Sequence, residues 1–354
     1  MGQMWSTEGA PSMLGIAAGW VSNKQAAIEA FDAAAQSLLD LAEAEYVLGR
    51  IDNAAGILVR AAEAARGLGE QDVRFACVLN RLGVIRFRQG KHDEARRLLK
   101  QAVAIAERAK MSGVEPATFL TNLGFVYRAA SEPAKARVAF EHALEVAGAG
   151  PGEPDQTVVW TLDQLGDLEA SEGNMPAALF AFQCALAIKE RAGGSNDWNF
   201  AVTLSKLGEV YLKQDRYNEA QSCLLRAIAI HERAVGWEHP AMAKPLARLA
   251  QLYQRQRKDG QAEQLAGYAL KLLASVFPPG HPEIIGCLNL LAGIYRGLGR
   301  YADADDVSKL AQALADGTGR HEKITRFILP NPPKLSLPQA PEVQEGGPAL
   351  QNVA

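Results

Sequence analysis

The feature that most limits the fold of this chain is an internal repeat that runs through most of its 354 residues. A Leu followed by a small residue recurs seven times, at intervals of 41 or 42 residues. These pairs begin at Leu41, Leu82, Leu123, Leu165, Leu207, Leu249 and Leu291. So regular a period indicates stacked copies of one supersecondary unit, since a single globular core has no reason to repeat its sequence.

Each repeat carries two apolar stripes with helical spacing. Leu at unit positions 4 and 7, the small residue at 8 and, in most units, Tyr at 11 form one stripe of an amphipathic helix. An alanine at position 20, with the residues at 24 and 27, forms the matching stripe on a second helix. The alanines are Ala54, Ala95, Ala136, Ala178, Ala220, Ala262 and Ala304. Each repeat is therefore predicted to be a helical hairpin.

A glycine stands between the two stripes in four repeats, at Gly49, Gly90, Gly173 and Gly299. Glycine suits the left-handed conformation that often ends a helix, so we expect the hairpin turn at these positions. One hairpin buries only one face, and its neighbours must stack to complete a core. The predicted fold is an all-α, right-handed superhelical solenoid of about seven antiparallel helical hairpins, with a concave and a convex surface.

The pattern Leu-Gly-x-x-Tyr, then Ala, Phe or Leu, and Ala resembles the tetratricopeptide repeat, most clearly from Leu123 to Ala143. The long period and the linkers His239-Pro240 and His281-Pro282 resemble the kinesin light chain subtype. The resemblance covers roughly residues 24 to 314. Glu169 and Arg86 depart from it, because they replace the Tyr. It implies the solenoid fold and a peptide-binding role, without a motor function.

The sequence divides into three parts. Residues 1–22 are predicted to be a flexible N-terminus, and 23–314 the tetratricopeptide-type solenoid, with units starting near 35, 76, 117, 159, 201, 243 and 285. Residues 315–354 are predicted to be a short cap segment and a Pro-rich disordered tail. The opening residues fit a minimal myristoylation pattern at Gly2, but so short a pattern is often accidental.

The segment from Ile324 to Leu329 lies where an eighth unit would begin, and Pro330 interrupts it. We favour a truncated capping helix that covers the apolar end of the stack. The alternative is a tail that folds back along the groove and competes with ligands.

Composition excludes several classes of protein. The net charge of −3 argues against a nucleic-acid binder, which needs a broad basic excess. The four cysteines are far apart and form no CxxC pair, which favours a reduced, cytoplasmic protein without a disulfide framework or zinc ribbon. The longest uncharged apolar stretch, residues 13–21, is about half the ~20 residues that a membrane helix needs, so no membrane span is predicted.

No motif of catalysis or of phosphate binding is present, so we predict neither an enzyme nor a cofactor or metal site. His239 and His281 precede Pro one repeat apart, which favours a role in the linker turns. Asp163 and Asp167 lie four residues apart on one helix face, but in a solvated groove their pKa values would have no reason to separate. Cys77 and Cys287 are predicted to be small core residues.

The outward face of each first helix carries the ligand candidates. The resemblance implies that this face lines the concave groove of a tetratricopeptide protein, and that side chains on it hold an extended or helical peptide. The candidates are Arg81, Arg88, Asn122, Arg128, Lys206, Lys213, Lys244, Arg248, Arg255, Asn289 and Arg296.

From the fifth unit onward the predicted groove is mainly basic, with Glu209 as the chief exception, which favours an acidic peptide. Toward the start, Asp40 and Glu43, with the Asp163 and Asp167 pair, make it acidic or mixed. Alternatively, the cations only keep the surface soluble.

The predicted function is a non-enzymatic, cytoplasmic scaffold that binds a peptide segment of a partner protein, acidic in character, in the concave groove. The alternative is a regulatory or assembly subunit of an enzyme or complex. That subunit would use its convex or terminal surfaces, with its own C-terminal tail in the groove.

Overall fold

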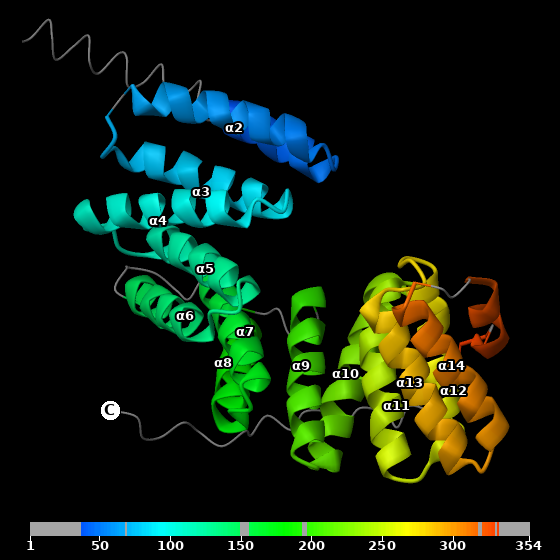
Figure 1. Cartoon of the computed structure of the whole chain (residues 1–354). Helices are drawn as coiled ribbons and strands as arrows, with labels where there is room; N and C mark the ends of the chain where they lie inside the picture. The colour runs from blue at the N-terminus through cyan, green and yellow to red at the C-terminus, as the bar shows by residue number, and fades with distance from the viewer. Residues whose placement is uncertain are drawn as a thin grey trace, which may run out of the picture. The chain divides into compact units, whose positions relative to one another are not determined.

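A computed structural model describes residues 37–67, 69–148, 156–192, 197–317, 321–329 and 331–332. Within these ranges every regular element is a helix, and consecutive helices form antiparallel pairs (Figure 1). The predicted all-α fold built from helical hairpins is confirmed, while the right-handed superhelical twist stays a prediction. Residues 1–22, including Gly2, lie outside the described residues.

The chain separates into two compact units, residues 1–161 and 162–354. The described part of unit 1 contains three helix pairs and the start of a further helix. Its described helices are residues 37–47, α2 (Ile51–Arg66), α3 (Val73–Arg88), α4 (His92–Arg108), α5 (Val114–Ala129) and α6 (Pro133–Gly148). The division falls inside α7 (Gln156–Ser171).

Unit 2 continues the same alternation of first and second helices. Its described helices are α8 (Met175–Arg191), α9 (Trp198–Lys213), α10 (Tyr217–Val235), η1 (Pro240–Met242), α11 (Ala243–Arg255), α12 (Asp259–Ala274), α13 (Pro282–Gly297), α14 (Tyr301–Ala315) and η2 (His321–Phe327). The first helices α3, α5, α7 and α9 begin three residues before the unit starts at 76, 117, 159 and 201.

The recurring alanine of the second helix is the most deeply buried position of the repeat. No solvent reaches any of the seven alanines, from Ala54 to Ala304. Because these alanines are fully buried, a bulkier residue at this position would have to displace its neighbours and would destabilise the packing.

The small residue of the first helix accepts a large side chain from the second helix of its own pair. A Cβ atom added to Gly124 would lie 2.5 Å from Cε1 of Phe140, a distance that real side chains do not reach. In a later repeat, where Ala250 takes the glycine's place, the residue at the Phe140 position is the small Ala266. In these two repeats the two positions are therefore matched in size.

The turn between paired helices has the same backbone conformation in every repeat. The predicted glycines have φ between 75° and 82°, which confirms their role. The three remaining pairs place non-glycine residues in this left-handed region, namely Ser131, Asp215 and Arg257, with φ of 57° to 59°. These three residues carry a steric cost of about 1–2 kcal/mol each that glycine avoids.

Replacing Arg257 with glycine is expected to stabilise the α11–α12 pair by about 0.5–1 kcal/mol, because relief of the left-handed strain exceeds the extra entropy of an unfolded glycine. Amide hydrogen exchange of α11 and α12 measures the change. Arg257→Ala is the control, since it removes the same side chain but keeps a Cβ atom in the left-handed region. Equal stabilisation by both variants would contradict the explanation.

The two His-Pro linkers start helices. The Nδ1 atom of His239 accepts a hydrogen bond from the backbone N–H of Ala241 at 3.2 Å, and Nδ1 of His281 accepts one from Glu283 at 3.3 Å. These bonds satisfy amide groups that the first turn of a helix leaves open. The prediction that both histidines shape the linkers is confirmed. Within the described ranges, no cluster of side chains is suited to hold a metal ion.

The segment that follows α14 packs on the end of unit 2. Ile324 is fully buried, and Phe327 belongs to the same apolar cluster as the last three helices. The side chain of Leu329 fills the space over Gly267 of α12, where an added Cβ atom would lie 2.8 Å from Leu329 Cγ. Arg326 bonds to Asp306 of α14 at 2.9 Å. The rest of the Pro-rich tail, apart from residues 331 and 332, lies outside the described residues.

Candidate functional site

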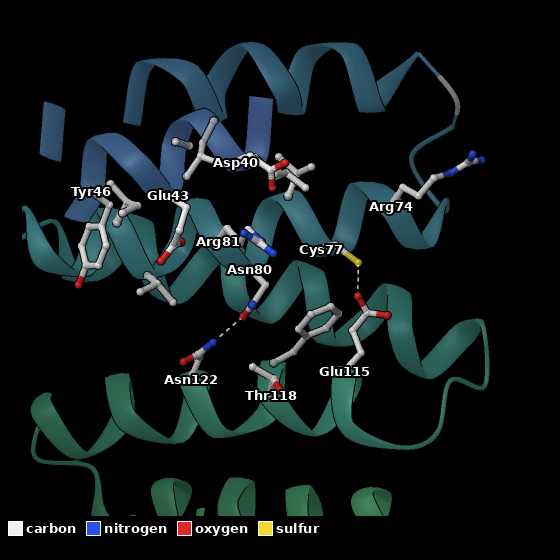
Figure 2. Close-up of a pocket in the computed structure, with 17 residues that line it drawn as sticks. Asp40, Glu43, Tyr46, Arg74, Cys77, Asn80, Arg81, Glu115, Thr118 and Asn122 are labelled. Carbon is white, nitrogen blue, oxygen red and sulfur yellow. Dashed lines mark hydrogen bonds between the residues drawn. The ribbon is translucent and has the colours of Figure 1, made fainter. Parts of the chain in front are cut away.

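A cavity of about 960 Å³ opens on the first-helix face of unit 1. It is lined mainly by helix 37–47, α3 and α5, with Leu58 of α2 at its apolar wall (Figure 2). We call it the N-terminal pocket. Its volume is in the range of cavities that hold small ligands or a few peptide residues.

Three residues at the same position of consecutive repeats line the N-terminal pocket, namely Asp40, Arg81 and Asn122. The Asn122 Nδ2 atom donates a hydrogen bond to Oδ1 of Asn80 at 2.9 Å, which ties α5 to α3. Asn80 is buried, and its amide is held by Asn122. The structure thus brings the predicted candidates Arg81 and Asn122 together in one pocket.

The charged groups of the N-terminal pocket differ in whether they are already paired. The Arg74 guanidinium bonds to Asp72 at 2.6 Å. Arg81 and Glu43 are both exposed, and neither has a hydrogen-bond or ion-pair partner within the described part of the chain. These two side chains are therefore available to a ligand.

Cys77 also lines this pocket, so the prediction that it is a core residue is wrong. Its Sγ lies 3.0 Å from Oε1 of Glu115 and donates to it. Burial, followed by the hydrogen bond to Glu115 and its charge, raises the pKa of the Cys77 thiol to about 12. The thiol stays protonated near neutral pH and is a poor nucleophile. Cys287 is buried as predicted.

Two predicted candidates of unit 1 do not line the N-terminal pocket. Arg88 is exposed at the end of α3. The guanidinium of Arg128 lies 5.3 Å from the centre of the Phe125 ring, in a cation–π contact.

The candidates of unit 2 lie on the first helices α9, α11 and α13, and we call them the unit 2 cationic face. They are Lys206, Lys213, Lys244, Arg248, Arg255, Asn289 and Arg296. Nζ of Lys206 lies 2.9 Å from a carboxylate oxygen of Asp167 on α7. Similarly, Nε of Arg248 lies 3.0 Å from Glu209 on α9. The contacts run from one repeat to the next.

The other cations of this face also have intramolecular partners. Lys244 pairs with Glu283 at 3.0 Å, Arg255 with Asp215 at 2.9 Å, and Lys213 with Glu209 at 3.3 Å. Arg296 donates to the Ser308 hydroxyl at 3.0 Å, while Asn289 is exposed without a partner in the described ranges. The sequence predicted a mainly basic surface, but its charge is largely neutralised at close range.

Asp163 does not lie free in a groove, because it is buried in a polar cluster. Lys189 Nζ donates to Asp163 Oδ2 at 3.3 Å and to the backbone oxygen of Asn199 at 2.9 Å. The Thr203 hydroxyl donates to Asp163 Oδ1 at 2.9 Å. The carboxylate is occupied, and Asp167 pairs with Lys206, so the two acids are not a free acid/base pair. The cluster joins α7, α8 and α9.

Paired helices with size-matched contacts and buried alanines define a helical repeat protein. The tetratricopeptide repeat model matches residues 33–108, 115–191 and 199–275, which is more than half of the chain. The chain belongs to the tetratricopeptide repeat family. Proteins of this family generally mediate protein–protein interactions and are typically not enzymes.

Several solved structures are similar to this chain. BtubC (BKLC) from P. vanneervenii matches 72% of this chain and 94% of its own, with 18% identity and a TM-score of 0.51. Apo RapI matches 82% and 99%, with 15% identity and a TM-score of 0.63. A Podosopora anserina putative kinesin light chain matches 56% and 94%, with 18% identity and a TM-score of 0.47. No curated protein matches the sequence.

No helix in the described ranges is both long and apolar enough to cross a lipid bilayer.

Proposed function

We propose that this chain is a non-enzymatic scaffold that binds a peptide segment of a partner protein on its first-helix face. The N-terminal pocket carries the proposal, because it combines a cavity of about 960 Å³ with exposed charged groups that have no partner in the described ranges. Peptide recognition of this kind uses hydrogen bonds to the ligand backbone and pairs with its charged side chains. The cytoplasmic location stays a prediction.

An acidic segment on the unit 2 cationic face is the finer version of this proposal. It is supported by the number of cations on α9, α11 and α13, but Lys206, Arg248 and Arg255 already contact carboxylates. An acidic ligand would have to exchange with these carboxylates. Each exposed pair contributes only about 0.2–1 kcal/mol, so breaking the existing pairs costs little free energy and forming pairs with the ligand contributes equally little. Salt would weaken the binding of the ligand further.

Affinity purification with mass spectrometry distinguishes the two surfaces. The pocket variant combines Arg81→Glu with Asn122→Ala. The face variant carries Lys206→Gln, Arg248→Gln and Arg255→Gln. Neutral glutamine is preferred because charge reversal would place carboxylates side by side and destabilise unit 2. The control is Arg97→Glu, an exposed residue of α4 away from the pocket.

A partner lost only with the pocket variant would place capture in unit 1, which is the expected result. Loss only with the face variant would place an acidic ligand on α9 and α11. A partner retained by both variants would contradict binding on the first-helix face and favour the convex or terminal surfaces.

A further inference from the structure

The N-terminal pocket is surrounded by charges of both signs, which limits the ligands it can accept. Its rim carries the carboxylates of Asp40, Glu43 and Glu115 and the guanidiniums of Arg74 and Arg81 (Figure 2). A purely acidic ligand would gain a contact with Arg81 and meet repulsion from the carboxylates. A purely basic ligand would leave Arg81 without a partner and place a cation beside it.

We propose that the N-terminal pocket selects a charge-balanced peptide segment, in which an acidic side chain pairs with Arg81 and a basic side chain pairs with Glu43. This proposal rests on the proposed peptide-binding function and adds the chemistry of the ligand. Arg81 and Glu43 carry it, because both are exposed and lack an ion-pair partner in the described part of unit 1.

The packing of the first helices sets the spacing of the two ligand charges. Glu43 lies on helix 37–47 and Arg81 on α3, which contribute Ala42, Leu82 and Ile85 to one apolar cluster. The axes of packed helices are about 8–10 Å apart. An extended peptide advances about 3.3 Å per residue, so neighbouring helices are about three ligand residues apart. The acidic and basic residues of the ligand should therefore be separated by about three positions.

Part of the pocket wall is apolar and still partly exposed. Leu39 and Tyr46 of helix 37–47 and Val84 of α3 line it. A ligand with aliphatic residues between its two charges would bury them there, and this burial gives the larger share of the binding free energy because exposed ion pairs contribute little. The charges then mainly decide which peptides are accepted.

The unit 2 cationic face does not offer the same selection. Its cations Lys206 and Arg248 already have carboxylates at 2.9 Å and 3.0 Å from a neighbouring repeat. A ligand charge of either sign therefore meets an ion pair that has no net charge. Acidic and charge-balanced peptides should bind to this face with similar affinity.

Fluorescence anisotropy with labelled, end-capped synthetic peptides tests the proposal on the full chain. The two balanced peptides contain Lys-Leu-Leu-Glu and Glu-Leu-Leu-Lys between glycines, which covers both binding directions. The comparison peptides contain Glu-Leu-Leu-Glu and Lys-Leu-Leu-Lys. One balanced peptide should bind up to about fivefold more tightly than either comparison peptide at low salt.

Two substitutions identify the side chains responsible. With Arg81→Glu, the preference should move to the Lys-Leu-Leu-Lys peptide, and with Glu43→Arg it should move to Glu-Leu-Leu-Glu. The Arg97→Glu variant changes charge equally but lies outside the pocket, so it should keep the preference of the unaltered chain. Circular dichroism checks that each variant is folded.

Two outcomes separate this inference from the function on which it rests. If the unaltered chain binds the acidic peptide most tightly and Arg81→Glu weakens that binding, the charge-balanced pattern is wrong but groove binding stands. If no peptide binds, or if neither substitution changes the binding, the N-terminal pocket is not the ligand site and this inference fails. The proposed function would then depend on the unit 2 cationic face, which the face variant tests separately.

Discussion

Replacing Lys189 with methionine is expected to lower the free energy of unfolding of unit 2 by about 3–5 kcal/mol. Lys189 is buried and bonds to Asp163, Thr203 and the backbone of Asn199. Removing its ammonium group leaves the buried carboxylate of Asp163 with only the Thr203 hydroxyl. A buried charge without its counter-ion is among the costliest changes that one substitution makes.

Amide hydrogen exchange of α7, α8 and α9 is the appropriate measurement, because repeat proteins open locally and have no single unfolding transition. Lys309→Met is the control, since Lys309 is an exposed lysine of α14 in the same unit. The double variant Lys189→Met with Asp163→Leu should recover most of the loss, because it removes both charges together. Unchanged exchange in the single variant would show that the cluster does not stabilise the junction.

Substituting alanine for Ile324 is expected to cost about 2–4 kcal/mol locally and to expose the apolar end of unit 2. Ile324 is fully buried, and Phe327 and Leu329 pack beside it on the last helices. The cavity left by the substitution should loosen the packing of segment 321–329 on the last helices. Faster proteolysis and faster amide exchange in α13 and α14 are the expected observations.

Thr325→Ala provides the matched control, because the Thr325 side chain is exposed in the same turn. If Ile324→Ala leaves α13 and α14 unchanged but strengthens the binding of a partner, the segment does not act as a cap. That result would favour a tail that competes with ligands.

The repeat architecture was predictable because its determinants are local and recur. The buried alanine, the small residue of the first helix and the turn glycine each recur at a fixed position of the repeat. The left-handed residues Ser131, Asp215 and Arg257 escaped prediction, because their side chains give no sign of the conformation. These three positions are identified only by their distance of one or more repeat lengths from the turn glycines.

The candidate sites were less predictable, because their chemistry depends on contacts between repeats. The carboxylates of Asp167 and Glu209 each lie 39 residues before the cation that they neutralise, Lys206 and Arg248. Repeat arithmetic applied to charges would have found both pairs.

The buried cluster around Lys189 has a signal in the sequence. Lys189 occupies a position of the second helix where the corresponding residues of most other repeats are apolar, such as Ala106 and Leu273, with His231 as the exception. A charged residue at a core position indicates a buried partner, which here is Asp163.

The contact between Gly124 and Phe140 has a consequence for how such a chain can change over evolutionary time. Both partners belong to a single repeat, so a copy of that repeat inherits a complete, size-matched hairpin and can be gained or lost as a block. The hydrogen bonds that join Lys189 and Asp163 to Thr203 cross from one repeat to the next instead. Gene duplication or deletion with a breakpoint between α8 and α9 would therefore remove the Thr203 hydroxyl from the buried Lys189–Asp163 pair, and the repeat that then follows α8 would have to supply a replacement partner.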